Sequence, residues 1–395
     1  MNKINIELPS SKSISNRLLI LNALSKNPFP IENLSICDDT QILFKVLNST
    51  ENQFDISAAG SAMRFLTAYL SITPGEWLIT GNERMKQRPI GILVDAINNI
   101  GGRIEYVEKE GYPPLKIFGG ELTGEEIELT ANVSSQYISA LLMIAPKMKN
   151  GLTIRLIGKI TSEPYIQMTL SLLKIFGVSF IQIDNVIHVY PCEYKPVPIK
   201  VESDWSAASY WFEFMALSKG DIEIYLKGLE KNSLQGDSIV AEIFKLFGVQ
   251  STFTSEGLQL KKSGTVVKNF SCKFTNNPDL VQTFAVTCAF LDIPFQFTGL
   301  QTLRIKETDR IAALLNELRK FGFDVKSNNI DNLFWNGDKI TKQSNICVET
   351  YNDHRMIMAF APAILKTTSF EIENRVGVGK SYPGFWEEFD KMVIE

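Results

Sequence analysis

The chain has 395 residues, of which 45% are hydrophobic and 21% are charged, and its formal net charge is −4. This length exceeds one ordinary core, and the acidic balance argues against a general nucleic-acid binder, so we expect a two-domain protein that binds no nucleic acid. Five cysteines without a CxxC pair and only two histidines predict no disulfide framework and no metal site. The start MNKINIELPSSKS lacks a signal-peptide core, and no window has the length of a membrane span, so a cytoplasmic protein without a membrane anchor is expected.

Segments with apolar residues at helical spacing recur along the chain, and each ends in a glycine, at Gly101, Gly177, Gly248 and Gly322. The intervals between these glycines are similar in length. Short β-branched or alternating runs follow them, as in FIQIDNVIHVY, and predict paired strands. The pattern predicts an α/β fold that is built from a repeated unit.

Each unit also contains a polar cluster that opens a second apolar helix. The six polar clusters begin at Ser11, Ser57, Ser134, Ser203, Asn276 and Asn352. Helix capping by Ser, Asp or Asn is the simple explanation for any one of them. Several clusters also carry arginine or lysine, and a helix start has free N–H groups and a partial positive charge. Several such starts aimed at one place would form an anion site.

The two chain ends together complete a sixth unit, because INIELP resembles a strand and PGFWEEFDKMVIE resembles a helix. The chain then crosses twice between two domains of three units each, near Pro9–Lys12 and near Ser203–Ser206. We expect residues 12–203 to form an N-terminal domain. Residues 1–11 and 204–395 are expected to form a C-terminal domain.

The stretch LRIKETDRIAALLNELRKFG concentrates charge where a predicted helix begins, at Arg304, Lys306, Glu307, Asp309 and Arg310. Other cations also occur at helix starts or in loops marked by glycine or proline. They are Lys12, Arg17, Arg64, Arg84, Arg88, Arg355 and Lys380. Arginine binds carboxylate and phosphate with a two-pronged fork, and lysine acts as a point charge. The pattern predicts a small ligand with phosphate and carboxylate groups.

Four carboxylates lie among these cations and are candidates for proton transfer: Asp279, Glu307, Asp309 and Asp353. The sequence has no GxxxxGK[ST] loop, no GxGxxG that opens a helix after a strand, and no GxSxG elbow. We therefore expect no nucleotide or dinucleotide cofactor.

Nine stretches follow the order of a known family: SKSISNR, AAGSAMRFL, RMKQRPIGILVDA, SSQYISALLM, SEPYI, NNPD, LRIKETDR, YNDHRM and GKSYPGF. The pair KETDR and NDHR is the most specific part. The chain resembles the 5-enolpyruvylshikimate-3-phosphate synthase family of enolpyruvyl transferases. The resemblance implies a two-domain inside-out α/β barrel of six repeated units with a double crossover. It also implies a monomer that needs no cofactor and no metal.

The reaction implied by this resemblance transfers the enolpyruvyl group of phosphoenolpyruvate to the 5-hydroxyl of shikimate 3-phosphate. C3 of phosphoenolpyruvate is protonated, the hydroxyl attacks C2, and the tetrahedral intermediate loses phosphate. The expected active site lies in the cleft between the domains. The N-terminal domain mainly contacts shikimate 3-phosphate, and the C-terminal domain carries KETDR, NDHR and Lys380.

The resemblance also implies roles for individual residues. Shikimate 3-phosphate contacts fall on Lys12, Ser13, Arg17, Ser134, Ser135, Gln136, Ser162, Tyr165, Asp279, Thr302 and Lys306. Phosphoenolpyruvate contacts fall on Lys12, Gly60, Arg88, Gln136, Arg310, Arg355 and Lys380. Catalytic roles fall on Lys12, Asp279, Lys306 and Glu307. Asp279 is the expected partner of the attacking hydroxyl, and Glu307 is the leading candidate for proton exchange at C3.

Four positions depart from the family pattern: Ser11, Ala58, Glu163 and Thr302 replace glycine, asparagine, lysine and asparagine. These departures are expected to bear on substrate affinity and on glyphosate sensitivity. Two alternatives stay open at this point. One is a UDP-N-acetylglucosamine enolpyruvyl transferase, although the region GNERMKQRP lacks the reactive cysteine usual there. The other is a catalytically inactive relative that acts as a binding protein.

Several polar residues have a structural interpretation instead. Arg64 lies one turn into an apolar helix and is expected to be structural, and Asp309 and Asp353 are expected to serve helix starts. His354 is expected to support a phosphate contact. His188 lies in an alternating strand and is expected at the surface or in packing.

Overall fold

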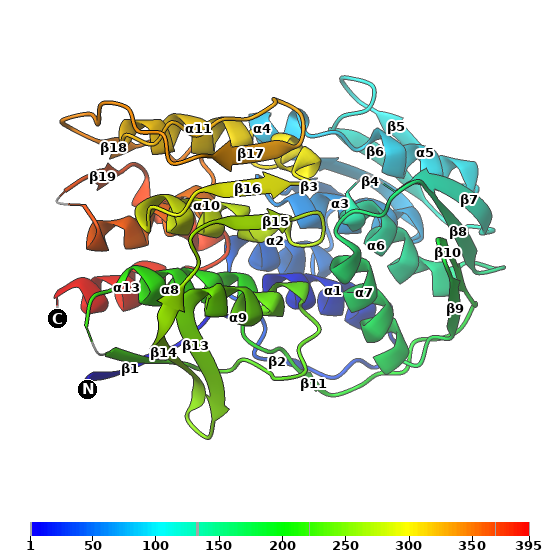
Figure 1. The fold of residues 1–395 in the computed structure, drawn as a ribbon. Helices are drawn as coiled ribbons and strands as arrows, with labels where there is room; N and C mark the ends of the chain where they lie inside the picture. The colour runs from blue at the N-terminus through cyan, green and yellow to red at the C-terminus, as the bar shows by residue number, and fades with distance from the viewer. Residues whose placement is uncertain (1, 132–133, 221, 368, 395) are drawn as a thin grey trace. The chain divides into compact units, whose positions relative to one another are not determined.

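The computed structural model describes residues 2–131, 134–220, 222–367 and 369–394. The chain forms two compact units (Figure 1): an N-terminal unit of Ser11–Val201, and a C-terminal unit of Met1–Ser10 with Glu202–Glu395. The chain therefore passes from one unit to the other at two places. Among the described residues, no helix has both the length and the apolar character needed to cross a membrane.

The N-terminal unit alternates helices with short strands. Its helices are α1 (Lys12–Ala23), α2 (Asp38–Leu47), α3 (Gly60–Ser71), α4 (Glu83–Lys86), α5 (Gly91–Asn99), α6 (Ser135–Ile144), η1 (Ala145–Lys147) and α7 (Glu163–Ile175). Its strands are β2 (Ile31–Glu32), β3 (Gln53–Asp55), β4 (Gly75–Thr80), β5 (Arg103–Tyr106), β6 (Leu115–Gly119), β7 (Glu125–Thr130), β8 (Leu152–Ile157), β9 (Phe180–Ile183), β10 (Val186–Val189) and β11 (Ile199–Lys200).

Two sheets of the N-terminal unit have the same design. Their strand orders are β3-β4-β6-β5 and β7-β8-β10-β9. In each sheet the first two strands are parallel and the other neighbours are antiparallel. Strands β2 and β11 form a further parallel pair. The strand pairing thus confirms the repeated α/β unit that the sequence predicts.

The C-terminal unit is built from the same kinds of elements. Its strands are β1 (Asn2–Ile6), β12 (Ile222–Leu226), β13 (Phe247–Thr254), β14 (Gly257–Val266), β15 (Phe270–Lys273), β16 (Phe295–Thr298), β17 (Asn332–Trp335), β18 (Cys347–Val348) and β19 (Glu371–Ile372). Its α-helices are α8 (Trp205–Leu217), α9 (Val240–Ile243), α10 (Val281–Phe290), α11 (Arg310–Lys320), α12 (His354–Phe360) and α13 (Phe385–Ile394). Its 3-10 helices are η2 (Gly236–Ile239), η3 (Phe244–Leu246), η4 (Pro278–Leu280), η5 (Gln301–Ile305), η6 (Ala361–Leu365) and η7 (Arg375–Lys380).

Both ends of the chain join the C-terminal unit. Strand β1 pairs in parallel with β12 and begins a sheet of the order β1-β12-β14-β13, which has the same design as the two N-terminal sheets. Helix α13 packs on α8, where the rings of Phe385 and Phe389 lie 6.1 and 6.3 Å from Trp211. The remaining sheets are β15-β16-β17 and β18-β19.

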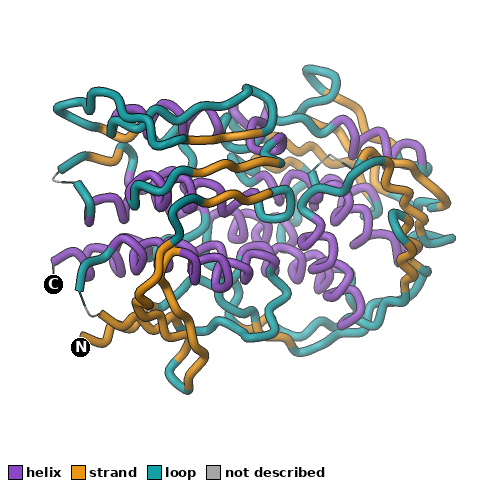
Figure 2. Tube along the Cα trace, viewed as in Figure 1, coloured by secondary structure: helices purple, strands orange, loops and turns teal. Residues whose placement is uncertain are grey.

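Helices form the inner layer of the N-terminal unit, and its sheets lie outside them (Figure 2). Most residues of α1, α3 and α6 are buried, whereas β7 and β8 alternate between buried and exposed positions. Such alternation is typical of a sheet with one face on a core and one in solvent. In the C-terminal unit, α8 and α10 contact each other and nearly all their residues are buried.

The polar clusters start helices in two different ways. Side chains of Ser11, Ser134, Asp204 and Asp353 accept a backbone hydrogen bond at the starts of α1, α6, α8 and α12. Helix α3 follows Ala59 and α10 follows η4, and neither start has a side-chain cap. The amides at the uncapped start of α3 are therefore available to other acceptors.

Three of the glycines that end predicted helices do so, and one does not. Gly101, Gly177 and Gly322 follow α5, α7 and α11 with positive φ angles of 98°, 77° and 93°, which glycine adopts readily. The helix predicted before Gly248 is wrong as a continuous element. It is broken into η2, α9 and η3, and Gly248 (φ 72°) lies inside β13 beside a register shift.

The carboxyl group of Glu213 is buried in the helical core of the C-terminal unit. Glu213 lies on α8 and is 0% exposed. Burial raises the pKa of Glu213 well above its ordinary value, because a charged carboxylate is poorly solvated there. The folded protein therefore holds a proton that the unfolded chain releases once the pH exceeds the ordinary glutamate pKa.

We predict that Glu213→Gln stabilises the protein increasingly as pH rises. Stability from the protonated carboxyl is fully present below the unfolded pKa of about 4.3 and is lost as pH rises toward the folded pKa. The glutamine amide does not ionise, so the variant does not lose this stability. The free energy of unfolding that the wild type loses is at most about 1.4 kcal/mol per pH unit. Urea unfolding of both proteins between pH 5 and pH 8 measures the difference. A difference that does not change with pH would contradict this account.

Candidate active site

Lys12 opens helix α1 and pairs with a carboxylate that the sequence analysis did not select. Ser11 caps the helix, because its Oγ accepts a hydrogen bond from the Ile14 amide at 3.4 Å. The Lys12 ammonium lies 3.2 Å from Oδ2 of Asp39, which is 4% exposed at the start of α2. The two adjacent aspartates Asp38 and Asp39 at a helix start were the available signal, since acidic residues are common there.

Arg17 connects three helices of the N-terminal unit. Its guanidinium donates to Thr169 Oγ1 at 2.7 Å, to Ser139 Oγ at 3.0 Å, and to the backbone oxygens of Ser13 and Tyr165 at 2.9 and 3.3 Å. Arg17 is 3% exposed, and burial lowers its pKa to about 10. Four contacts within the protein occupy most of its five N–H donors, so Arg17 also positions α1, α6 and α7.

A second group forms where α3 and α6 begin. Ser134 caps α6, and Gln136 in its first turn donates from Nε2 to Ser61 Oγ at 3.1 Å. The Arg88 guanidinium lies directly against Gly60, because a Cβ built on Gly60 would be 2.4 Å from Arg88 Nη1. The structure therefore brings four predicted site positions together beside the uncapped amides of α3.

Other N-terminal candidates lie on the same helices. Ser135 is buried in the first turn of α6. Ser162 precedes α7 with a left-handed φ of 55°, and Tyr165 follows in the first turn, where its carbonyl accepts from Arg17. Arg64 donates to the backbone oxygens of Gly60 and Pro89, which supports the structural role predicted for it.

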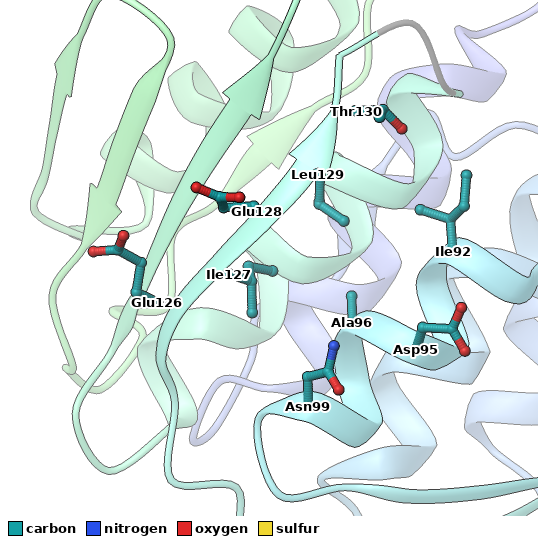
Figure 3. Close-up of a pocket in the computed structure, with 9 residues that line it drawn as sticks. All are labelled: Ile92, Asp95, Ala96, Asn99, Glu126, Ile127, Glu128, Leu129 and Thr130. Carbon is teal, nitrogen blue, oxygen red and sulfur yellow. The ribbon is translucent and has the colours of Figure 1, made fainter.

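A separate hollow of about 410 Å³ lies between α5 and β7 in the same unit (Figure 3). It contains none of the predicted site residues. Its charged lining residues are the acids Asp95, Glu126 and Glu128. Glu126 forms an ion pair with Arg155 on β8. The acidic lining makes this hollow unsuitable for the anions that the sequence predicts.

In the C-terminal unit, Arg310 is the centre of a buried ion network. It begins α11 and is 1% exposed. Its Nε donates to Asp353 Oδ2 at 2.7 Å, Nη1 donates to Asp279 Oδ1 at 2.9 Å, and Nη2 donates to Glu307 Oε2 at 2.9 Å. These three carboxylates raise the pKa of Arg310 although burial alone would lower it. A buried arginine needs such partners, because an uncompensated charge in a protein interior is costly.

Asp279 lies among three cations. The nearest atoms are Arg310 Nη1 at 2.9 Å, Arg355 Nη2 at 3.0 Å and Lys306 Nζ at 3.6 Å. Burial raises the pKa of Asp279, but the three cations together outweigh it and hold that pKa well below the ordinary value. Asp279 is therefore a carboxylate at neutral pH, and its low pKa makes it a weak base in this state of the site. Burial lowers the pKa of Lys306, although Asp279 opposes this.

Glu307 bridges two cations that the sequence places 70 residues apart. One oxygen accepts from Arg310, and the other lies 3.4 Å from Lys380 Nζ at the end of η7. Glu307 itself lies between η5 and α11, and Thr302 lies earlier on η5. The neighbouring Asp309 accepts from the amides of Ile311 and Ala312, which confirms its predicted role at the helix start.

Asp353 has two functions, of which the sequence analysis identified one. It caps α12 by accepting from the Arg355 amide at 3.0 Å, as predicted, and it also binds Arg310. Arg355 reaches Asp279 and donates to the Tyr210 hydroxyl at 3.4 Å. Burial raises the pKa of Tyr210 to about 12. Tyr210 was not predicted, because it is one aromatic residue in an apolar helix.

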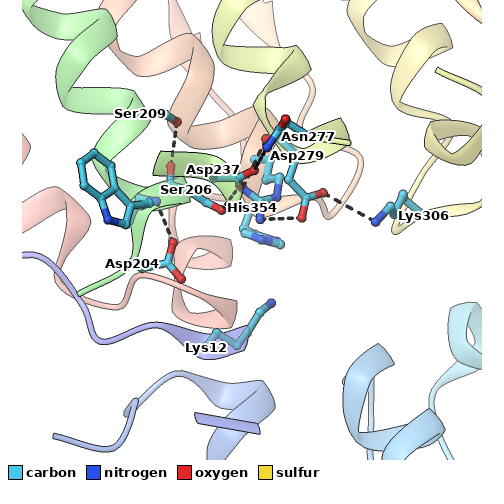
Figure 4. A network of polar contacts seen from close by, with 12 residues as sticks. Lys12, Asp204, Ser206, Ser209, Asp237, Asn277, Asp279, Lys306 and His354 are labelled. Atoms are coloured by element: carbon cyan, nitrogen blue, oxygen red, sulfur yellow. Dashed lines mark hydrogen bonds and ion pairs between the residues drawn. The ribbon is translucent and has the colours of Figure 1, made fainter. Parts of the chain in front are cut away.

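A buried acid next to Asp279 was also missed. Asp237 on η2 is 3% exposed and accepts from Asn277 Nδ2 at 3.0 Å and from Ser206 Oγ at 2.5 Å. Figure 4 shows Ser206, Asp237 and Asn277 next to Asp279, with Lys306 on the far side of Asp279. Burial, and then the charge of Asp279, raise the pKa of Asp237 to about 6. No repeat or spacing signal marks Asp237, which lies in the irregular segment before α9.

His188 has the packing role that was predicted. It lies on β10, where it shares a hydrogen bond with Thr153 and meets the ring of Tyr190 edge-on. The described residues contain no group of three histidine, cysteine, aspartate or glutamate side chains arranged to hold a metal ion.

The family model of EPSP synthase (3-phosphoshikimate 1-carboxyvinyltransferase) matches residues 45–389. The chain belongs to this family. A 3-phosphoshikimate 1-carboxyvinyltransferase of Bacteroides fragilis is 54% identical over 391 residues, which cover 98% of this chain and 95% of that protein. One of Haemophilus influenzae is 33% identical over 426 residues, 99% of this chain and 96% of that protein.

Solved structures have the same fold. An EPSP synthase from Acinetobacter baumannii has a TM-score of 0.77 at 21% identity and covers 99% of this chain and 95% of its own. The enolpyruvyl transferase NikO from Streptomyces tendae has a TM-score of 0.72 at 12% identity, with coverage of 99% and 95%. The mixed α/β fold is therefore that of the enolpyruvyl transferases, as the sequence resemblance implied.

We predict that Gly60→Ala displaces Arg88 without disturbing the fold. The added methyl group meets the end of a flexible side chain, which moves easily. KM for phosphoenolpyruvate is expected to rise by about tenfold, because the displaced Arg88 loses one charge-assisted contact with this substrate. Steady-state kinetics and a thermal melt measure both effects. Gly120→Ala is the matched control, because open space surrounds Gly120. A wild-type KM in Gly60→Ala would contradict the prediction.

Proposed function

We propose that the protein transfers the enolpyruvyl group of phosphoenolpyruvate to the 5-hydroxyl of shikimate 3-phosphate and releases phosphate. The observation that carries this proposal is the match to 3-phosphoshikimate 1-carboxyvinyltransferases over nearly the whole chain, at 54% identity to that of Bacteroides fragilis. The product is 5-enolpyruvylshikimate 3-phosphate, a precursor in aromatic amino acid biosynthesis. The family match favours this acceptor over UDP-N-acetylglucosamine.

The charges of the two groups of site residues suit these substrates. Phosphoenolpyruvate and shikimate 3-phosphate each carry a phosphate and a carboxylate. The N-terminal group supplies Lys12, Arg88 and the free amides of α3, and a helix start stabilises an anion. The C-terminal group supplies Arg310, Arg355 and Lys380 as further anion contacts.

Shikimate 3-phosphate is assigned mainly to the N-terminal unit. Lys12 lies at the start of α1 and contacts both substrates in this proposal. The other contacts proposed there are Ser13, Arg17, Ser134, Ser135, Gln136, Ser162 and Tyr165. They occupy the starts of α1, α6 and α7, apart from Arg17 one turn further into α1.

Proton transfer is assigned to the C-terminal unit. Asp279 accepts a hydrogen bond from the 5-hydroxyl of shikimate 3-phosphate and orients it, because the carboxylate stays ionised at neutral pH. Glu307 exchanges the proton at C3 of phosphoenolpyruvate. Lys306 contacts shikimate 3-phosphate and supplies a cation beside the reacting groups, where it offsets the charge of the departing phosphate. Thr302 on η5 is assigned a further shikimate 3-phosphate contact.

The complete active site is proposed to form where residues of both units face the two substrates. The assignment of residues 12–203 mainly to shikimate 3-phosphate, and of KETDR, NDHR and Lys380 to the other domain, is part of this proposal. Closure on binding would exclude water and align the reactants. A cytoplasmic monomer that uses no cofactor completes the proposal.

Phosphate release from phosphoenolpyruvate tests the proposed reaction. The purified protein is incubated with phosphoenolpyruvate and either shikimate 3-phosphate or UDP-N-acetylglucosamine. We expect release with shikimate 3-phosphate alone. Release with UDP-N-acetylglucosamine alone would assign the other transferase. Release with neither acceptor, from folded protein, would mean that Ser11, Ala58, Glu163 and Thr302 have removed catalysis and left a binding protein.

We predict that Glu307→Gln lowers turnover by about a hundredfold or more, the usual contribution of a general acid–base group. The amide keeps the shape and can still accept from Arg310, so the circular dichroism spectrum and substrate binding are expected to persist. Asp309→Asn is the matched control, because asparagine also caps helices well. Turnover like that of the wild type in Glu307→Gln would remove Glu307 from the proton-transfer step.

A further inference from the structure

A basic hollow of about 400 Å³ lies on the C-terminal unit, where α10 and α11 end. Lys339, Lys342 and Lys366 line it, together with the single acidic residue Asp292. The charged lining therefore carries three positive charges and one negative charge. The rings of Phe290, Phe321 and Phe323 form part of the wall.

This hollow is separate from the group around Arg310. Arg310 is the first residue of α11, whereas Phe321 and Phe323, which line the hollow, follow the last residue of the same helix. A helix of 11 residues is about 16 Å long at a rise of 1.5 Å per residue. Asp279 likewise precedes α10, and Asp292 follows it.

Capping of helix ends does not explain the three lysines. Helix C-termini carry a partial negative charge that lysine often neutralises. At the ends of α10 and α11, backbone amides occupy carbonyls of the last turn instead. The Ile293 amide donates to the Cys288 carbonyl at 2.9 Å, and the Phe323 amide donates to the Leu318 carbonyl at 3.2 Å. A lysine that does serve a helix end is Lys262, whose ammonium donates to the Ala216 carbonyl of α8 at 2.9 Å.

The contacts of the three ammonium groups leave the hollow positively charged. Lys339 pairs with Asp292 and lies 4.1 Å from the ring centroid of Phe323. Lys342 donates to the neutral hydroxyl of Thr367 at 2.6 Å. Lys366 is exposed. Burial lowers the pKa of Lys262, and the positive charge of Lys366 lowers it further. Two of the three positive charges therefore have no acidic partner within the lining of the hollow.

We propose that this hollow binds a compact anion with two or more negative charges, of the phosphate or polycarboxylate class. Its volume lies within the range of small-molecule sites. The acidic hollow between α5 and β7 has nearly the same volume but the opposite charge, so charge decides which of the two receives the anion. The proposal does not depend on the transferase reaction.

Indole NMR of the full chain labelled with 15N-tryptophan tests this proposal. Trp335 reports on the hollow, because the Lys339 ammonium lies 4.8 Å from the centroid of its ring. The signal is assigned with Trp335→Phe. Citrate and pyrophosphate are titrated separately at constant ionic strength, with acetate as the monovalent comparison. We expect a saturable shift of the Trp335 signal with at least one polyanion and weaker binding of acetate.

Lys342→Gln and Lys366→Gln are each expected to weaken polyanion binding by about fivefold or more, the loss expected for one charge-assisted contact. Lys366→Arg should retain it, and Lys245→Gln on η3 is the matched control. Binding of citrate alone identifies a polycarboxylate site, and binding of pyrophosphate alone identifies a phosphate site. The proposal is overturned if neither anion gives a saturable shift, if acetate binds as tightly, or if both glutamine variants bind like the wild type.

Discussion

The buried guanidinium of Arg310 is the interaction on which the C-terminal group of site residues depends. It contacts carboxylates from three separate segments, at Asp279, Glu307 and Asp353. Each segment is fixed independently, by η4 before α10, by the turn before α11, and by the cap of α12. The unfavourable free energy of burying the Arg310 charge is offset only when all three segments hold their carboxylates against it. The geometry of the site therefore depends on the packing of these helices.

This arrangement also separates the roles of the acidic residues. Cations hold the pKa of Asp279 well below its ordinary value, whereas burial raises that of Asp237 to about 6 and that of Glu213 well above the ordinary value. The difference follows from the neighbours of each carboxyl group, since desolvation alone would raise the pKa of all three. Asp279 is thus available as a hydrogen-bond acceptor, and Glu213 belongs to the core.

Much of the fold and of the site could be predicted from the sequence, because both follow from local patterns. Glycines after apolar stripes and polar residues before them marked helix ends and starts, which is where Lys12, Arg310 and Arg355 lie. The broken helix before Gly248 could not be predicted, since its apolar periodicity does not reveal that the chain turns into β13. The pairing of Lys12 with Asp39 depends on tertiary packing, as does the burial of Asp237 beside Asn277 and Asp279. No local pattern encodes such contacts.

The ionisation of Asp279 tests the central role of Arg310 most directly. The carboxyl carbon of Asp279 can be followed by 13C NMR from neutral pH to the acid limit of the folded protein, with Asp279→Asn for assignment. We predict that Asp279 stays ionised over this whole range in the wild type, and that in Arg310→Gln it takes up a proton at higher pH. Titration of Asp279 near the ordinary aspartate pKa in the wild-type protein would contradict the account.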